Sequence, residues 1–395
     1  MPKRKAEDSV SVYKKFTYGE NTQGEDILYL QQKSKKDQSI LLNELAFLHG
    51  MTSSFVPVMF RLLESVIPMP FKMIAYKKIL TLETDPTGKV RQWIDSFLRI
   101  PFLQTVPFPI PEKSNVFLKE CETILDECTF GMKDAKHQFL QLIGKWLVNP
   151  DSMGTAIALK GPMGTGKTTL IKHGISKILK RPFAFVPLGG ASDGSFLEGH
   201  SFTYEGSTYG KIVDILIQTK TANPVIFFDE LDKVSQSEKG SEIIGILTHL
   251  TDTTQNSQFH DKYFSELDFD LSKCLFVFSY NDEQLVNPIL KDRMVTIEIT
   301  GYDTSDKLVI ARDYLIPDIQ KEYRMDISWN EDWIVHLIHC TEKEEGVRNL
   351  KRNLDKVYSR LNLLRLTEES TKLTRELLEE WFPKVHLETY SSMYL

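Results

Sequence analysis

A glycine-rich stretch constrains this chain more than any other part of it. The stretch fits the pattern G-x-x-x-x-G-K-[S/T], typical of loops whose backbone N–H groups surround phosphate, and reads Gly161-Pro162-Met163-Gly164-Thr165-Gly166-Lys167-Thr168-Thr169. An apolar run at 155–159 predicts a strand before it, and helically spaced apolar residues at 169–179 predict a helix after it. This order directs free N–H groups and a helix N-terminus at an anion. We therefore predict an ATP site, in which Lys167 reaches the terminal phosphates and the Thr168 hydroxyl holds Mg²⁺.

The residues around this loop predict an α/β domain. Apolar runs typical of buried strands recur along the chain, at 183–188, 223–230, 273–281 and 294–299. Helical patterns at 210–220 and 241–250 separate some of them. Strands that alternate with helices indicate a parallel sheet with right-handed crossovers. The runs are apolar throughout, as expected when both faces of the sheet are covered.

The rest of the chain divides by composition and period. We expect four parts: a polar, partly disordered segment (1–37), a helical N-terminal region ending in a proline-rich linker (38–112), the α/β core (113–300) and a smaller helical lobe (301–395). The first part has too few apolar residues for a core. Prolines at 107, 109 and 111 mark the linker.

Polar side chains follow two of the predicted strands. Asp229 and Glu230 end the run at 223–230, and Asn281 ends the run at 273–281. Phosphoryl transfer needs positioning and charge neutralisation, so Asp229 is a candidate ligand for the magnesium and Glu230 a candidate base for the attacking water. A solvated strand end would also account for these acids. For Asn281, a role in holding the water or the γ-phosphate stands beside an ordinary turn asparagine.

Composition sets the expected surroundings. The net charge is −6, and no apolar run approaches the roughly 20 residues that span a bilayer. The N-terminus lacks the apolar core of a signal peptide. The sequence contains no C-x-x-C pair of the kind that would indicate a metal site. We expect a soluble intracellular protein without a membrane partner, in the cytoplasm, or in the nucleus if the basic run at 2–5 is an import signal.

Several further motifs resemble the ATPase module of Lon proteases, in the AAA+ class. The resemblance extends over about residues 85–385, and the motifs occur in the same order and spacing. They are LGGA (188–191), EGHSFTYEG (198–206), FDELDK (228–233), QNSQFHD (255–261), FDLSKCLF (269–276), DRM (292–294), GY (301–302), YLIP (314–317) and GVR (346–348). The resemblance implies an AAA+ P-loop domain followed by a helical lid.

The resemblance also implies roles for residues that composition alone does not single out. Asn281 matches sensor 1, Arg293 the arginine finger given to a neighbouring subunit, and Arg348 sensor 2 on the lid. A finger that acts in trans implies a ring, expected to be a homohexamer. Tyr204 matches the aromatic residue of a pore loop that grips polypeptide, and Glu205 lies beside it.

Three departures from the family pattern limit what it implies. Glu205 replaces an aliphatic neighbour of the pore tyrosine, and the segment 234–240 lacks the aromatic residue expected of a second pore loop. Both weaken the expected grip. The chain ends soon after the lid, so we expect no Ser–Lys peptidase domain and no peptidase activity.

The sequence thus favours an ATP-hydrolysing ring that remodels or unfolds protein substrates, alone or feeding a separate protease. One alternative is an AAA+ motor or loader acting on nucleic acid or nucleoprotein, which the acidic balance disfavours. Another is an ATP-bound scaffold that does not hydrolyse, which the presence of Glu230, Arg293 and Arg348 disfavours.

Overall fold

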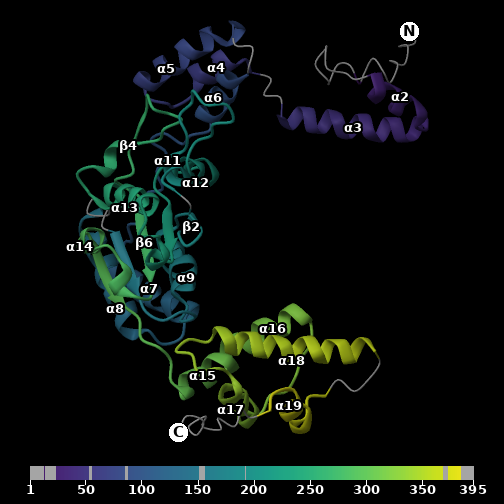
Figure 1. Ribbon diagram of the computed structural model, residues 1–395, viewed down its shortest axis with the longest axis vertical. Helices are drawn as coiled ribbons and strands as arrows, with labels where there is room; N and C mark the ends of the chain where they lie inside the picture. Colours follow the sequence, from purple (N-terminus) through teal and green to yellow (C-terminus); the bar gives the residue numbers. More distant parts are fainter. Residues whose placement is uncertain are drawn as a thin grey trace, which may run out of the picture. The chain divides into compact units, whose positions relative to one another are not determined.

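The structure is a computed structural model (Figure 1). Its residue contacts divide it into two compact units, Met1–Leu98 and Arg99–Leu395. It describes residues 13, 24–52, 56–84, 88–150, 156–191, 193–367 and 372–383. Most of the segment predicted to be partly disordered lies outside these residues. Its end does not: helix α2 spans Gly24–Gln32 and α3 spans Lys35–Thr52, so helical structure begins earlier than expected.

The first unit is helical, as predicted for the N-terminal region. After α3 it contains α4 (Val58–Glu64), α5 (Met69–Leu80), the short η1 (Leu82–Thr84) and α6 (Lys89–Phe97). Pro57 and Pro68 precede α4 and α5, where the fixed φ of proline suits a helix start. Trp93 stacks on Phe97 with ring centroids 5.0 Å apart, and Arg61 pairs with Asp95 at 3.3 Å.

The second unit is built on a five-stranded parallel sheet in the order β2-β3-β6-β1-β7, which confirms the predicted fold class. Each predicted strand is present. Their bounds are β1 Ala156–Lys160, β2 Phe183–Pro187, β3 Val225–Asp229, β6 Leu275–Tyr280 and β7 Met294–Glu298. The short hairpin β4 (Phe259–His260) and β5 (Asp268–Phe269) was not predicted.

Helices cover the sheet (Figure 1). They are α7 (Ser114–Cys128), α8 (Lys133–Val148), a continuous helix of α9 (Lys167–Thr169), η3 (Leu170–Ile175) and α10 (Ser176–Leu179), then α11 (Ser195–Glu198), α12 (Lys211–Thr219), α13 (Glu238–Thr251) and α14 (Pro288–Asp292). Leu125, Phe139 and Ile175 from three of these helices form one buried cluster with Ile157 and Val277 of the central strands. This core fixes the loop between β1 and α9.

The proline-rich segment before α7 is attached to the sheet domain. Asn223, just before β3, accepts a hydrogen bond from Val106 N (2.8 Å) and donates one to Val106 O (2.9 Å). Phe108 is buried and joins the sheet core. Prolines lack the backbone N–H that would pair with a neighbouring strand. The Asn223 side chain instead bonds the backbone of Val106, just before Pro107, so this segment is ordered against the sheet domain.

The C-terminal lobe is helical, as predicted, with its own core. It comprises α15 (Thr304–Ile310), η7 (Ala311–Leu315), α16 (Ile316–Tyr323), α17 (Glu331–Cys340), α18 (Arg348–Leu366) and α19 (Arg375–Trp381). Leu337, Leu354 and Tyr358 are fully buried in that core. Asp303 begins α15 with a reciprocal capping box to Asp306. Within the described ranges, no helix of either unit is both long and apolar enough to cross a membrane.

Candidate functional site

The glycine-rich loop joins the end of β1 to the start of α9, as the sequence predicts. Gly166 precedes the helix with φ of 95°, a conformation that residues with a Cβ rarely adopt. Gly164 has φ of 76°, and a Cβ there would lie 3.0 Å from Arg348 N. Val347 N donates a hydrogen bond to Gly164 O (3.1 Å). The loop therefore contacts both the sheet domain and the first turn of α18.

Lys167 is buried and is held by its own loop. Its Nζ donates hydrogen bonds to Gly161 O, to Pro162 O (3.1 Å) and to Asn281 Oδ1 (2.9 Å). Burial lowers the pKa of Lys167 to about 8, an effect that Asp229 and Asp232 partly oppose. The ammonium group thus rests among carbonyl and amide oxygens at the mouth of the loop, and a phosphate group would supply the charge partner that these neutral oxygens lack.

Asp229 and Glu230 follow β3, and a residue on the neighbouring strand orients both. Ser279 on β6 lies beside Asp229 in the sheet and donates its hydroxyl hydrogen to Asp229 Oδ1. The same hydroxyl accepts a hydrogen bond from Glu230 N (3.4 Å). Glu230 has φ of 60°, which turns the chain sharply away from the strand. Sequence reasoning missed Ser279, although its position two residues before Asn281 on a parallel neighbour could have indicated it.

Asn281 is positioned by a buried carboxylate, Asp232, which the sequence analysis also missed. Asp232 Oδ2 accepts hydrogen bonds from the backbone N–H groups of Asn281 (3.3 Å) and Asp282 (3.2 Å). The Asp232 side chain is fully buried in the turn after β3. It therefore ties that turn to the end of β6, where the Asn281 amide meets Lys167.

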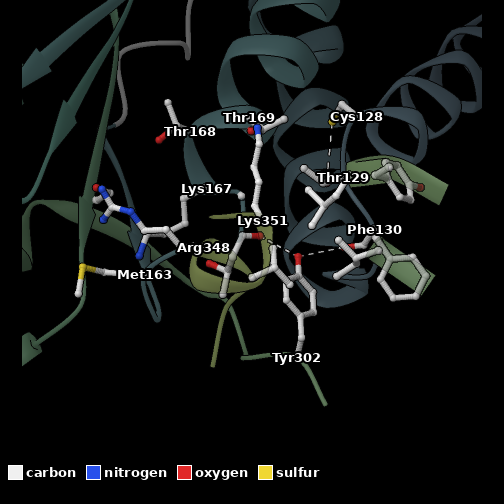
Figure 2. A pocket seen from close by; sticks show the side chains of 18 of the residues that line it. Cys128, Thr129, Phe130, Met163, Lys167, Thr168, Thr169, Tyr302, Arg348 and Lys351 are labelled. Carbon is white, nitrogen blue, oxygen red and sulfur yellow. Dashed lines mark hydrogen bonds between the residues drawn. The ribbon is translucent and has the colours of Figure 1, made fainter. Parts of the chain in front are cut away.

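The helical lobe closes the other side of the cavity. Arg348 begins α18 and Lys351 lies one turn further on; both line the cavity beside Lys167 and Thr168 (Figure 2). Glu344 fixes the start of α18, since its carboxylate accepts hydrogen bonds from the N–H groups of Asn349 and Leu350. A carboxylate at a helix N-terminus is stabilised by the unpaired N–H groups there.

An aromatic and apolar wall completes a cavity of about 530 Å³. It was not predicted. The Tyr302 hydroxyl lies 2.7 Å from Thr165 O and 3.3 Å from Phe130 O and shares its one hydrogen between them, which joins the phosphate loop to the α7–α8 turn (Figure 2). The rings of Phe130 and Tyr314 meet edge to face at 6.4 Å. Burial raises the pKa of Tyr302, so this hydroxyl stays protonated. A flat heteroaromatic base suits such a wall.

The structure brings most, but not all, predicted site residues together. The cavity is lined by Met163, Gly164, Thr165, Gly166, Lys167, Thr168, Thr169, Asp229, Glu230, Asn281 and Arg348. Gly161 and Pro162 line an adjoining cavity of about 900 Å³ that shares Arg348.

Three predicted residues lie away from this cavity. Arg293 follows α14, where its Nη1 donates to Asp252 Oδ2 (2.5 Å) and Thr248 O (3.4 Å). Tyr204 is 68% exposed on the loop between α11 and α12, and Glu205 is exposed beside it.

Comparison with known proteins identifies the class of this site. Residues 157–302 match the family described as "ATPase family associated with various cellular activities (AAA)". This match spans β1 to Tyr302 and so includes the phosphate loop, Asp229, Glu230 and Asn281. The chain therefore contains an AAA ATPase domain.

The similarity to full-length proteins is more specific. The chain is 37% identical over 359 residues to a Lon protease homolog of Acanthamoeba polyphaga mimivirus, covering 86% of this chain and 35% of the relative. It is 35% identical over 308 residues to the mitochondrial Lon protease homolog of Candida glabrata (76% and 29%), and 37% identical over 265 residues to the Lon protease of Cytophaga hutchinsonii (66% and 32%). The ATPase is of the Lon-like AAA+ type, and the chain spans about a third of the length of these curated relatives.

The lowered pKa of Lys167 predicts a pH-dependent affinity for ATP. Phosphate binding favours the charged ammonium, but above pH 8 the nucleotide-free protein holds this group neutral and must first take up a proton. We expect the Kd for ATP to rise with pH above 8, by up to about tenfold per pH unit. Titration calorimetry from pH 7 to 9.5 measures this. The exposed Lys172→Met variant should retain the slope, and a flat wild-type profile would contradict the assignment.

Proposed function

We propose that this chain hydrolyses ATP in the cavity between the sheet domain and the helical lobe, and that it uses the energy to remodel or unfold proteins. The observation that carries the first part is that one cavity collects Lys167, Asp229, Glu230, Asn281 and Arg348 from four separate segments. Phosphoryl transfer depends on positioning and electrostatic stabilisation, and these residue types supply both.

The residues divide the work by their chemistry. Lys167 exchanges its bonds to Gly161 O and Pro162 O for the terminal phosphates, where it neutralises developing charge. Glu230 accepts a proton from the attacking water, and Asn281 orients that water or the γ-phosphate. Arg348 reaches the phosphates from the lobe, so nucleotide binding joins the two parts of the unit.

Thr168 and Asp229 fit the requirements of a magnesium site. Both line the cavity, and oxygen ligands from a hydroxyl and a carboxylate suit this ion. The Ser279 hydroxyl bonds to one oxygen of Asp229 and thereby fixes the orientation of the carboxylate. When bound, Mg²⁺ would neutralise charge on the phosphates during transfer.

We further propose that the active form is a ring, a homohexamer, in which Arg293 completes the site of the neighbouring subunit. Two observations support this proposal. Arg293 does not line the cavity of its own chain, and the Lon-like relatives carry the same type of module. An arginine delivered in trans couples hydrolysis to assembly, because an isolated subunit then lacks one charge of the site.

For the substrate we propose extended polypeptide that is gripped by Tyr204 and handed to a separate protease. Tyr204 is exposed on a loop whose two ends are fixed, as an aromatic side chain that grips polypeptide would require. An aromatic ring presses on many kinds of side chain, so such a grip tolerates sequence variation. The neighbouring Glu205 is charged, so we expect a weaker grip than a tyrosine with an aliphatic neighbour would give.

The Tyr204→Ala variant tests this part of the proposal. We expect basal ATP hydrolysis within about twofold of wild type, because Tyr204 is remote from the cavity, and a loss of at least about tenfold in stimulation by an unfolded protein such as casein. The matched control is Thr203→Ala, which shortens the neighbouring side chain but keeps the aromatic side chain of Tyr204. Equal stimulation of Tyr204→Ala and wild type would show that polypeptide is not gripped here.

A further inference from the structure

The loop that carries Tyr204 has a narrow neck. Residues 199–210 leave the end of α11 and return to the start of α12, and the two ends touch: a Cβ at Gly210 would lie 2.1 Å from Leu197 O. His200 N donates a hydrogen bond to Thr208 O (3.1 Å), which closes the neck from inside. Gly199 has φ of 76° where the chain turns into the loop. Only small residues permit so close a crossing.

The segment that follows β4 clamps both sides of this neck. Asp261 is fully buried, and its Oδ2 accepts a hydrogen bond from Gly210 N (2.7 Å). Lys262 holds the opposite side: its N–H donates to Glu198 O (2.7 Å), and its Nζ pairs with Glu198 Oε2 (3.3 Å). Asp261 and Lys262 therefore contact both the segment that enters the loop, at Glu198, and the segment that leaves it, at Gly210. Figure 1 labels α11, α12 and β4, which border this neck and its clamp.

The clamp is itself rigid. The other oxygen of Asp261 accepts hydrogen bonds from Tyr263 N (2.9 Å) and Phe264 N (3.2 Å), so its carboxylate is fixed on three N–H groups. Tyr263 packs edge to face on Phe202, with centroids 5.5 Å apart, and on Tyr209, at 6.1 Å. Phe202 and Tyr209 lie on the two arms of the loop. Aromatic contacts of this kind fix relative orientation as well as burying area.

We propose that Asp261 is a positioning residue for substrate handling: through Gly210 it anchors the Tyr204 loop to the sheet domain, so that force on a gripped chain reaches the domain. The inference rests on the proposed grip by Tyr204. A loop held at one side only would pivot about its neck, and movements of the domain would not displace its tip. A fully buried carboxylate is costly, and neutral side chains would pack here at lower cost, but an anion accepts three N–H bonds at once.

Burial raises the pKa of Asp261 to about 6, against the three N–H bonds that lower it, and Glu198 adds a small further rise. The titratable groups near it are Glu198 on the neck and the hydroxyl of Tyr263; Lys262 of the clamp is adjacent in the chain and is paired with Glu198. Because the folded-state pKa exceeds the usual 3.8, stability from this group is present at acidic pH and is lost as pH rises through 6. The Asp261 carboxylate is therefore ionised at neutral pH and takes up a proton near pH 6.

The experiment compares Asp261→Asn with Asp268→Asn, the same substitution at an exposed position of the same hairpin. We expect Asp261→Asn to keep basal ATP hydrolysis within about twofold and to lose about tenfold in casein-stimulated hydrolysis, the effect of removing one hydrogen bond to a charged group. Hydrogen exchange of peptides from 199–210 should accelerate, while peptides of β1 and β3 stay protected. Asp268→Asn should match wild type throughout.

The outcomes separate the clamp from the grip. Normal stimulation and unchanged exchange in Asp261→Asn, with Tyr204→Ala defective, would overturn the clamp and leave the proposed grip intact. Normal stimulation in Tyr204→Ala would overturn the grip itself, and loss of basal hydrolysis in Asp261→Asn would show a general structural role, which also overturns the proposal. If Asp261→Asn does not fold, hydrogen exchange of the wild type decides: a Gly210 N–H that exchanges as fast as those of the exposed residues 203–206 would contradict the clamp.

Discussion

Replacing Glu230 with Gln should lower the rate of ATP hydrolysis by about 10³-fold and leave ATP binding intact. A positioned general base contributes roughly 10²- to 10⁴-fold, and the amide has the shape of the carboxylate but cannot accept the proton of the attacking water. The backbone of Glu230 keeps its bond to the Ser279 hydroxyl in the variant, so the turn after β3 should stay in place. Steady-state phosphate release and equilibrium binding of a fluorescent nucleotide measure the two properties separately.

The matched control is Glu238→Gln, which makes the same change at an exposed position in the first turn of α13. It should hydrolyse ATP at the wild-type rate. If Glu230→Gln also turns over at that rate, Glu230 is not the base. If the variant loses ATP binding as well, its carboxylate supports the cavity structurally and the assigned role is wrong.

Replacing Arg293 with Ala should lower hydrolysis by a similar factor, about 10³-fold, for a different reason. An arginine that contacts the transferred phosphate contributes roughly 10³- to 10⁵-fold, and Arg293 is the residue that we propose to act in the neighbouring subunit. Asp252, which pairs with Arg293 in this structure, also accepts hydrogen bonds from Thr254, and these bonds together with Arg293 lower the pKa of Asp252 to about 2. Thr254 remains in the variant, so we expect the end of α13 to keep its structure.

The control for this variant is Arg312→Ala, which removes an exposed arginine that pairs with Asp313 and Glu331 on the helical lobe. Hydrolysis should be unchanged there, since neither partner lines the cavity. Hydrolysis by Arg293→Ala within a few-fold of wild type at assembled concentrations would contradict the role of Arg293 as a finger. Measurements over a range of protein concentrations separate slow catalysis from failed assembly.

The core of the site could be predicted from the sequence because it depends on local patterns. The glycine spacing from Gly161 to Thr169 sets a loop conformation, and apolar runs ending in Asp229 and Asn281 mark strand ends at one edge of a parallel sheet. The carboxyl ends of these strands then lie close together, because parallel strands end at the same edge of the sheet. The five strands follow from the same reasoning.

The supporting residues could not be predicted this way because they depend on register and on contacts distant in sequence. Ser279 reads as part of an apolar strand until its alignment with Asp229 is known. The wall formed by Phe130, Tyr302 and Tyr314 needs the helical lobe to fold back on the turn before α8. The docking of the proline-rich segment likewise depends on one buried asparagine, Asn223, far along the chain.

A mixing experiment tests most directly whether Arg293 of one subunit completes the phosphate site of the next. Glu230→Gln and Arg293→Ala subunits are each expected to be inactive alone. When they are co-assembled in equal amounts, about a quarter of the sites pair an intact Glu230 with an intact Arg293 from a neighbour, so hydrolysis should recover to about a quarter of the wild-type rate. Mixed assemblies that stay as inactive as either variant would contradict the shared site.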